Sequence, residues 1–581
     1  MLTPRPEYPR PLLVRPDWKN LNGSWCFVED AGDVGLIEGW FKAGLPKGAG
    51  TIQVPFPVES EASTIHNIQP ASVVWYQRDF DLPLAWDKRV CLRFGACDHW
   101  TRVFVNGQEV GQHRGGYAPF AFDIDHVVGS GTNTIVVRVE DSLSWTQPRG
   151  KQAGTTRWPI DYDSVTGIWQ TVWLESLPPV SIESTLSVFG VDSGELVLTA
   201  LFSKQVEGEL TVELLLAGVL VDRKQVNTGL RSEARVSFQL DEPLLWSPDS
   251  PILYDVKLTL LDIRTGSVDE ATSYIGLREV EVRDGFLLLN GEKLFLRGIL
   301  DQGYFPGGWY TALSDADLRR DVELTLQMGF NCARKHQKAE DPRYLYWADK
   351  LGLLVWAEMP SGKIFSTELV QTLVSEWTDL VKRDRAHPCV IAWVPFNESW
   401  GVWHQSSRPQ QRAFVDGVVG ITRAMDASRP VVGNDGWEFS SGDLWTLHLY
   451  FEGKSLNQRL NELIKSPQSS VAEGNGMGSR VGALPGANVE GLPILLTECG
   501  GVGYGRFSES DFSYGDLPET EVLLQETIQE IAKMIRAAPK LQGFVWTQLT
   551  DVQQEVNGLL YFDRTPKLPI ETLHEIISSI G

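Results

Sequence analysis

The stretch 392-AWVPFNESWG-401 ends an apolar run on two polar residues. The run from Ala392 to Phe396 is typical of a strand buried on both faces, yet Asn397 and Glu398 follow it at once. One interpretation is a strand that leaves the core and reaches water. The other is a catalytic acid at the carboxyl end of a barrel strand, where the active sites of (β/α)8 barrels lie. A second carboxylate in the same situation would decide between them.

The region around this stretch alternates apolar strands with amphipathic helices from about residue 280 onward. Ser314 and Asp317 have the spacing of a capping box, and Leu318 and Val322 share one helical face behind them. The expected strands are 293–300, 330–336, 353–360, 390–398, 431–435, 444–450, 493–500 and 541–548. Eight strands in about 300 residues predict a (β/α)8 TIM barrel.

The first half of the chain has the pattern of all-β domains. Short alternating runs fill residues 1–180, and Asn106-Gly107 is a strong two-residue hairpin signal. Many short strands separated by turns predict a jelly roll. Residues 181–277 contain four plain strands and predict an immunoglobulin-like β-sandwich. The predicted domains are therefore 1–180, 181–277 and a catalytic barrel over 278–581.

The bulk composition describes an acidic globular chain. Its 581 residues are 42% hydrophobic and 22% charged, and the formal net charge is −23. Such a charge opposes binding to nucleic acid, which requires basic patches, and to anionic membrane surfaces. The 21 Trp fit either a β-rich core or a surface for sugar rings. We expect no nucleic-acid partner and no membrane. The oligomeric state stays open, with a homo-oligomer as one alternative.

The cysteines and the N-terminus bear on the compartment. The cysteines show no metal-binding spacing and read as buried thiols of a reducing compartment; they are Cys26, Cys91, Cys97, Cys332, Cys389 and Cys499. The N-terminus is rich in Pro and Arg without the apolar core of a secretory signal, and no run approaches the length of a membrane span. We expect a cytoplasmic protein, although a chain trimmed of its signal would look the same.

The second carboxylate is Glu498, at the end of 493-PILLTECG-500. The carboxyl ends of parallel barrel strands meet at one mouth, so Glu398 and Glu498 are expected to face each other. Glycoside hydrolysis uses two carboxylates that flank the scissile bond, and the distance between them distinguishes retention from inversion of the anomeric configuration. The alternative is a pair of unrelated structural acids.

Other predicted strands also end on polar or aromatic residues, as expected for a pocket that binds a hydroxyl-rich ligand. These candidate substrate-binding residues are Asp301, Gln302, Arg334, His336, Glu358, Asp435, Trp437, His448, Tyr450 and Trp546. Each of them could instead be structural. No metal-binding spacing, Walker loop, strand-linked GxGxxG or GxSxG elbow occurs, so we expect neither a metal nor another cofactor.

Several longer runs point to one family. They are 20-NLNGSW-25, 75-WYQRDFDLP-83, 104-FVNGQEVGQHRGGYAPFAFDI-124, 167-GIWQTVWLE-175, 245-LWSPDSPILY-254, 289-LNGEKLFLRG-298, 397-NES-399 and 497-TECGG-501. Together they resemble glycoside hydrolase family 2, the family of β-galactosidases, β-glucuronidases and β-mannosidases, over nearly the whole chain. The resemblance implies a sugar-binding jelly roll, an immunoglobulin-like domain and a catalytic barrel that cleaves a carbohydrate substrate.

The resemblance also implies roles for single residues. Glu398 would be the acid/base and Glu498 the nucleophile of a retaining reaction, with Asn397 on the 2-hydroxyl of the sugar. Trp546 would be an aromatic platform. Asp161, in the loop 158-WPIDYDSVTG-167, would reach over from the jelly roll, as an aspartate does in some relatives.

The chain departs from the family pattern at several points. The run 334-RKHQK-338 has its histidine one place early, and the Asn-x-Lys element that grips a glucuronic acid carboxylate is not visible in 556-VNGLLYFDRTPK-567. The expected substrate is therefore a terminal β-galactoside. The alternatives are a furanoside, either β-galactofuranoside or α-L-arabinofuranoside, a glucuronide, which the departure disfavours, and a glycan-binding protein without activity. The Gly/Ser-rich loop 466–491 is either an active-site lid or a disordered insertion.

Overall fold

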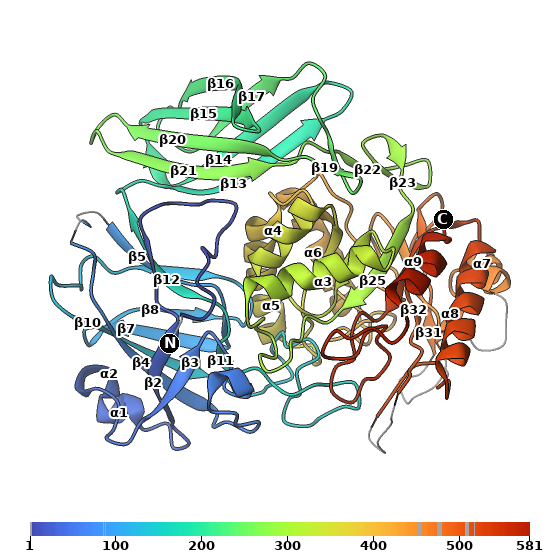
Figure 1. Ribbon diagram of the computed structural model, residues 1–581, viewed down its shortest axis with the longest axis horizontal. Helices are drawn as coiled ribbons and strands as arrows, with labels where there is room; N and C mark the ends of the chain where they lie inside the picture. The colour runs from blue at the N-terminus through green and yellow to red at the C-terminus, as the bar shows by residue number, and fades with distance from the viewer. Residues whose placement is uncertain are drawn as a thin grey trace.

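The computed structural model describes residues 3–84, 86, 89–450, 456–472, 479–505, 511–515 and 517–581. Figure 1 shows two β-rich regions beside a region of helices and strands that holds the C-terminus. This agrees with the predicted order of jelly roll, immunoglobulin-like sandwich and TIM barrel. The domain boundaries at 180/181 and 277/278 stay predictions.

The N-terminal region contains two facing antiparallel sheets. One has the order β1 (Trp18–Asn20), β12 (Val172–Leu177), β5 (Arg89–Phe94) and β9 (Phe120–Asp123). The other has the order β3 (Gly50–Val54), β2 (Gly23–Glu29), β4 (Val73–Phe80), β10 (Asn133–Glu140), β7 (Trp100–Val105) and β8 (Gln108–Arg114). Short elements join them: α1 (Gly35–Glu38), α2 (Trp40–Ala43), η1 (Glu61–Ser63), and the paired β6 (Cys97–Asp98) and β11 (Gly167–Ile168).

The hairpin predicted at Asn106-Gly107 joins β7 to β8. Both turn residues have positive φ, 48° and 79°, as a type I′ turn requires, and its twist matches that of the flanking strands.

The middle region is a sandwich of a three-stranded and a four-stranded sheet. The first has the order β13 (Ile182–Gly190), β14 (Glu195–Val206) and β17 (Arg231–Gln239). The second has the order β16 (Val219–Asn227), β15 (Gly208–Leu216), β20 (Tyr254–Asp262) and β21 (Val268–Ile275). Alternate residues of these strands are buried in one cluster between the sheets. Short strands lead on to the barrel: β18 (Trp246–Ser247), β19 (Ser250–Pro251), β22 (Val280–Arg283), β23 (Phe286–Leu289) and β24 (Glu292–Lys293).

The barrel is built on a seven-stranded sheet whose neighbouring strands are all parallel. Its order is β28 (Val390–Val394), β27 (Leu354–Glu358), β26 (Cys332–Lys335), β25 (Leu296–Asp301), β33 (Leu541–Thr547), β32 (Ile494–Gly500) and β29 (Trp445–His448). Segment 431–435, the expected fifth strand, pairs with the β28 segment through two isolated parallel bridges, Trp393 to Val431 and Asn397 to Asp435. The His448 backbone N–H donates to the Gly436 carbonyl at 3.1 Å, so the chain at 431–436 lies between β28 and β29 and closes the ring.

Helices follow the strands as predicted from the apolar period. They are α3 (Asp315–Gln327), α4 (Pro342–Leu351), α5 (Thr367–Asp384), α6 (Pro409–Met425), α7 (Leu456–Lys465), α8 (Glu521–Arg536) and α9 (Ile570–Ser578). Ser314 and Asp317 form the expected capping box of α3, and Gly352 ends α4 in the left-handed conformation. Within the described ranges, no helix combines the length and apolar character needed to cross a membrane.

Two segments of the long loop 466–491 pair as antiparallel strands. β30 (Ser470–Ala472) pairs with β31 (Arg480–Val481), and Phe439 bridges to Ala483 beside it. Residues 473–478 lie outside the described residues, so the lid alternative stays a prediction.

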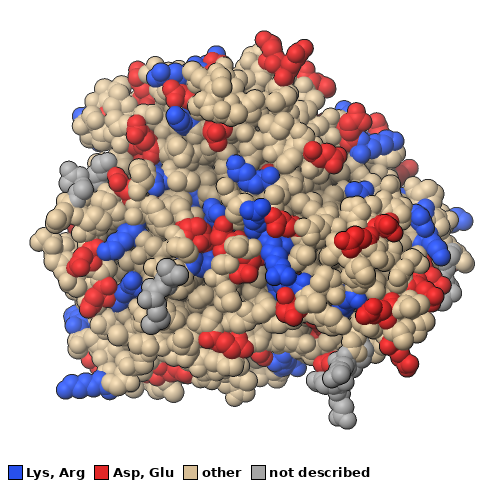
Figure 2. Space-filling model, in the orientation of Figure 1, with Lys and Arg blue, Asp and Glu red and all other residues tan. Residues whose placement is uncertain are grey.

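The N-terminal region and the barrel share one core. Tyr117, Tyr162 and Trp169 of the N-terminal region belong to the same buried cluster as the barrel strands. This continuous packing holds the loop 141–166 of the N-terminal region against the barrel. On the face drawn in Figure 2, Lys and Arg side chains lie among Asp and Glu side chains.

Candidate active site

Two glutamates meet at the carboxyl ends of the barrel strands, the mouth of the barrel. Glu498 lies near the end of β32, and Glu398 lies four residues beyond the end of β28. A carboxylate oxygen of each and a ring nitrogen of His448 all lie within 4.8 Å of one another. The Glu498 side chain is 8% exposed and the Glu398 side chain 19%. Both acids are therefore close together and nearly removed from water.

The backbone at Glu398 is held in an uncommon conformation. Glu398 and Ser399 both have positive φ, 51° and 58°, a region that residues with a Cβ seldom occupy unless their surroundings impose it. The Glu398 N–H donates to the Asp435 carbonyl at 2.9 Å, and the Ser399 N–H donates to the Asn434 side chain at 2.9 Å. The neighbouring segment therefore fixes where the Glu398 carboxyl points.

Arg334 from β26 links the acids into one network. Its guanidinium lies 3.0 Å from Glu498 Oε1, 2.9 Å from Asp435 Oδ2 and 2.7 Å from Glu358 Oε2. It also donates to Asn397 Oδ1 at 2.6 Å. Although burial by itself lowers the pKa of Arg334, the three carboxylates outweigh it and raise the pKa well above its usual value. Arg334 thus stays charged and fixes Glu498, Asn397 and Asp435 relative to one another.

The two glutamates have pKa values displaced in opposite directions. Burial and the negative charge of Glu498 raise the pKa of Glu398. Burial acts the same way on Glu498, but the charges of His448 and Arg334 outweigh it and lower the pKa of Glu498. When the pair holds a single proton, that proton therefore lies on Glu398 rather than on Glu498.

His448 from β29 bridges the pair. Its Nδ1 lies 2.7 Å from Glu398 Oε1 and 3.5 Å from Glu498 Oε2, and its Nε2 lies 3.5 Å from Asp435 Oδ2. Burial lowers the pKa of His448, yet these carboxylates outweigh it and raise the pKa to about 10. The imidazole is therefore cationic at neutral pH and partly offsets the repulsion between the glutamates.

Aromatic side chains lie close to the two acids or to the chain that carries them. The Tyr450 hydroxyl donates to Glu498 Oε2 at 2.7 Å, and Trp437 lies edge-on to His448 with 6.0 Å between ring centroids. Trp546 is fully buried on β33, and a side chain at Gly500 would meet its ring at 2.6 Å. The structure thus places Tyr450 on Glu498, Trp437 on His448 and Trp546 behind Gly500.

Four of the predicted substrate-binding residues have polar contacts with side chains other than Glu398 and Glu498. Asp301 pairs with Lys335 at 2.7 Å, and Gln302 donates to Gln548 at 2.9 Å. His336 lies 3.1 Å from Glu358, the outer side of the Arg334 network. Asp161 pairs with Lys363. The substrate-binding role of these four residues stays a prediction.

Sequence reasoning missed several residues at the mouth. Tyr514 stacks on Tyr450 with ring centroids 4.7 Å apart, and burial together with the charges of Glu555 and Glu498 raises its pKa well above the usual value. Thr497 donates to Asp435 at 2.7 Å. Tyr514 lies in irregular chain, so a search of strand ends does not find it. Thr497 lies beside Glu498 near the end of β32, where such a search could have found it.

The N-terminal region also contributes side chains to the mouth. Lys151 Nζ lies 2.9 Å from Glu555 Oε2, and the Tyr162 hydroxyl donates to the same oxygen at 2.5 Å. Glu555 is fully buried. No signal in the sequence links Lys151 or Tyr162 to Glu555, which lies about four hundred positions further along the chain.

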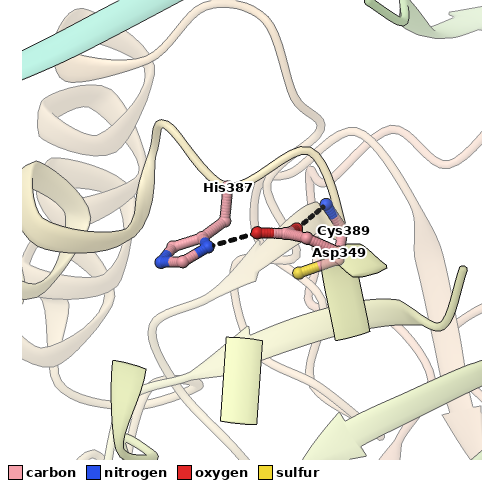
Figure 3. Close-up of side chains that lie close together, drawn as sticks. All are labelled: Asp349, His387 and Cys389. Atoms are coloured by element: carbon pink, nitrogen blue, oxygen red, sulfur yellow. Dashed lines mark hydrogen bonds and ion pairs between the residues drawn. The ribbon is translucent and has the colours of Figure 1, made fainter. Parts of the chain in front are cut away.

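Two clusters among the described residues could in principle hold a metal ion. One is Glu398, His448 and Glu498, where the charge on Arg334 and His448 opposes a further cation. The other is Asp349, His387 and Cys389, drawn in Figure 3.

The Figure 3 cluster lies just before β28 starts, at the amino ends of the barrel strands. His387 Nδ1 lies 2.6 Å from Asp349 Oδ2, the Tyr274 hydroxyl donates to that oxygen at 2.7 Å, and the Cys389 N–H donates to Asp349 Oδ1 at 2.9 Å. Because both Asp349 oxygens accept hydrogen bonds and the cluster is buried, it fits a structural anchor at the stable end of the barrel.

Comparisons with known proteins cover most of the chain. The model "Glycosyl hydrolases family 2, sugar binding domain" matches residues 18–178, "Glycosyl hydrolases family 2" matches 192–278, and "Glycosyl hydrolases family 2, TIM barrel domain" matches 280–470.

The curated relatives include a β-galactosidase and β-glucuronidases. A β-galactosidase of Thermoanaerobacter pseudethanolicus is 30% identical over 389 residues, which are 62% of this chain and 48% of the relative. A β-glucuronidase of Paenibacillus borealis is 28% identical over 471 residues, 73% of this chain and 74% of the relative. The chain thus spans about half the length of the β-galactosidase that it matches.

Solved structures share the architecture. A β-glucuronidase from Ruminococcus gnavus in complex with D-glucuronic acid superposes with a TM-score of 0.79 at 21% identity, covering 98% of this chain and 99% of that one. A β-galacturonidase from Eisenbergiella tayi superposes with a TM-score of 0.76 at 20% identity, covering 99% and 98%. The three matched domains in their order, together with this shared architecture, establish that the chain belongs to glycosyl hydrolases family 2.

Proposed function

We propose that the protein is an exo-acting retaining glycosidase that removes terminal sugars by double displacement. One observation carries the proposal: two opposed carboxylates lie with oxygens within 4.8 Å, and their pKa values are displaced in opposite directions. The spacing is near the roughly 5–5.5 Å of retaining enzymes rather than the roughly 6.5–9.5 Å that leaves room for water in inverting ones.

The first step assigns one role to each glutamate. Ionised Glu498 attacks the anomeric carbon, and protonated Glu398 gives its proton to the departing glycosidic oxygen, so a glycosyl-enzyme ester forms as the aglycone leaves. Arg334 and Tyr450 each hold one oxygen of Glu498, which orients the nucleophile before the substrate arrives.

The second step reverses the role of the acid. Glu398, now ionised, takes a proton from water, and the water oxygen attacks the anomeric carbon and releases Glu498. Loss of the negative charge on Glu498 in the intermediate removes a cause of the raised pKa of Glu398. The same carboxyl therefore becomes acidic enough to act as a base.

Contacts from the N-terminal region support exo-action. Lys151 and Tyr162 both bind Glu555 and so hold the loop 141–166 against the barrel. A wall on one side of the mouth favours a pocket for a terminal sugar over an open groove for a chain interior.

The substrate proposed first is a β-galactoside, as in the β-galactosidase relative. Segment 556–567, where relatives grip a glucuronic acid carboxylate, offers no unpaired cation: Arg564 lies 2.9 Å from Asp321 and Lys567 lies 2.7 Å from Asp551. The buried Glu555 beside this segment further disfavours a sugar carboxylate. The names of the β-glucuronidase relatives keep the glucuronide as the second candidate, and a furanoside is the third.

A panel of 4-nitrophenyl glycosides tests the proposal. We expect the highest kcat/KM with the β-galactopyranoside, compared with the β-glucuronide, β-galactofuranoside and α-L-arabinofuranoside. Proton NMR of the first product should show the β-anomer. Release of the opposite anomer would contradict the retaining mechanism, and the absence of any cleavage would favour a glycan-binding protein.

The cysteines support the expected reducing compartment. All six lie within the described residues, and all six are free. We propose a cytoplasmic enzyme on this basis.

A further inference from the structure

Four indole rings gather beside the acid/base loop. Trp158 lies 5.1 Å from Trp145, 6.3 Å from Trp400 and 6.0 Å from Trp403, between ring centroids. Trp145 and Trp158 come from the loop 141–166 of the N-terminal region, and the other two follow Glu398 in the barrel. The rings therefore form a cluster shared between two domains.

The cluster is organised around Lys363. The Lys363 ammonium lies 4.5 Å from the Trp145 ring centroid, 4.3 Å from that of Trp158 and 5.0 Å from that of Trp400, distances at which a cation is attracted to an aromatic face. The same ammonium pairs with Asp161, whose second oxygen accepts a hydrogen bond from the Trp158 backbone N–H at 2.9 Å. The rings are thus fixed before any ligand binds.

The cluster is connected to the loop that carries Glu398. The Trp400 backbone N–H donates to the Asn397 carbonyl at 2.9 Å and closes a turn over Glu398 and Ser399. Arg480 joins the Trp403 carbonyl at 2.9 Å to Glu438, which accepts from the Ser399 hydroxyl at 2.5 Å. Because Glu398 protonates the leaving oxygen in the proposed reaction, groups attached to its loop are near the aglycone rather than the cleaved sugar.

Three of these rings are left partly open. Trp145, Trp158 and Trp403 are half-buried, whereas Trp400 is 2% exposed. Most of the largest fully buried side chains of the protein are tryptophans, so the fold readily encloses indoles elsewhere. Packing between domains accounts for the contacts among the rings, but it does not account for three neighbouring rings that keep an exposed surface next to a catalytic acid.

We propose that Trp145, Trp158 and Trp403 form the aglycone site, and that this site takes an aglycone with a flat apolar face. Indole rings bind such faces by stacking. Two kinds of aglycone share this chemistry, an aryl group and the C–H face of a second sugar. The inference rests on the proposed function and names the part of the substrate that the panel of sugars leaves undetermined.

The test compares glycosides that share the cleaved sugar and differ in the aglycone. Methyl, phenyl and glucosyl aglycones are offered to the wild-type protein and to Trp158→Ala. We expect the variant to raise KM about tenfold for the phenyl glycoside or the disaccharide, the effect of losing one ring stack, and to leave KM for the methyl glycoside unchanged. Whichever of the two substrates responds identifies the aryl or the sugar aglycone.

Two further variants separate stacking from folding. Trp158→Phe keeps a flat ring and should restore most of the wild-type KM. Trp100→Ala removes a half-buried indole from β7 of the same region and should change no KM. Melting temperatures of all variants are measured alongside.

The outcomes distinguish this inference from the proposed function. Equal KM increases for all three aglycones, or none, would overturn the aglycone site and leave the glycosidase intact. If Trp158→Ala does not fold, the wild-type protein still decides, because equal KM values for its methyl, phenyl and glucosyl substrates would also overturn the site. A wild-type protein that cleaves no glycoside overturns both.

Discussion

The two ends of the barrel hold similar side chains in contrasting states. At the amino ends, Asp349 accepts hydrogen bonds on both oxygens, and it is fully buried beside a His387 side chain that is 1% exposed. At the carboxyl ends, Glu398 has His448 as its close partner, faces the repulsion of Glu498 and keeps a side chain that is 19% exposed.

The difference shows why one buried carboxylate stabilises the fold whereas another is suited to take part in a reaction. A buried carboxylate whose two oxygens both accept hydrogen bonds is stabilised in its ionised form, and it contributes to the stability of the fold. A carboxylate that shares its surroundings with a second one has a displaced pKa and an open side for a ligand. The comparison predicts that substitutions at the mouth change rates, whereas substitutions at the opposite end change stability.

The largest effect is expected for Glu498→Ala. Loss of the nucleophile should lower kcat by roughly 10⁴-fold or more, the scale seen when a covalent nucleophile is removed, with an unchanged melting temperature. Added azide should restore part of the rate and give a glycosyl azide of opposite anomeric configuration, which NMR identifies. Retention of activity in this variant would remove Glu498 from the mechanism.

Glu398→Ala should have the next largest effect, and it should depend on the leaving group. Substrates with poor leaving groups need the proton and should lose about 10²- to 10⁴-fold in kcat/KM, whereas 4-nitrophenyl glycosides should lose far less in the first step. Parallel measurements on a methyl and a nitrophenyl glycoside check this. Equal losses on both substrates would speak against the acid role.

Asp349→Ala should act on stability alone. It leaves the His387 ring, the Tyr274 hydroxyl and the Cys389 N–H without their acceptor, which should lower the free energy of unfolding by about 3 kcal/mol or more. Urea unfolding measures the loss, and kcat/KM per folded molecule should stay at the wild-type value. Glu323→Ala, which breaks an exposed pair with Arg319, is the control and should cost no more than about 0.5 kcal/mol. A rate defect in Asp349→Ala would contradict the division between the two ends.

The smallest effect is expected in the pH dependence of kcat/KM. The active form has Glu498 ionised and Glu398 protonated, so activity is lost as pH falls through the lowered pKa of Glu498 and as pH rises through the raised pKa of Glu398. His448 lowers the pKa of both acids. His448→Gln should therefore move both limbs of the profile to higher pH, and a shift of either limb to lower pH would contradict the assigned charge on His448.

Much of the architecture was predictable because it depends on local patterns. Alternating apolar residues predicted the two β-rich regions, and strands separated by amphipathic helices predicted the barrel, since burial imposes periods of 2 and 3.6 on the residues that face a core. Even segment 431–435, which forms only isolated bridges, was visible as a strand.

The site was predictable in part, because a parallel barrel brings its strand ends together. This rule placed Glu398, Glu498, Arg334 and His448 at the mouth. It did not say where each side chain points: Asp301 also ends a strand, yet its carboxyl binds Lys335. Tyr514 lies in irregular chain, and its position depends on packing against Tyr450 rather than on any period.

By itself the sequence determined the kinds of domain, their order along the chain, and the two glutamates that end barrel strands. Tertiary structure alone decided that Trp158 lies beside Trp403 and that Lys151 reaches Glu555. It also decided that Arg334 and His448 lower the pKa of Glu498, while the charge of Glu498 helps to raise the pKa of Glu398. The physical reason is range. Periodicity records how each segment packs against a core, whereas electrostatic and stacking interactions depend on distances between segments that are far apart in the sequence.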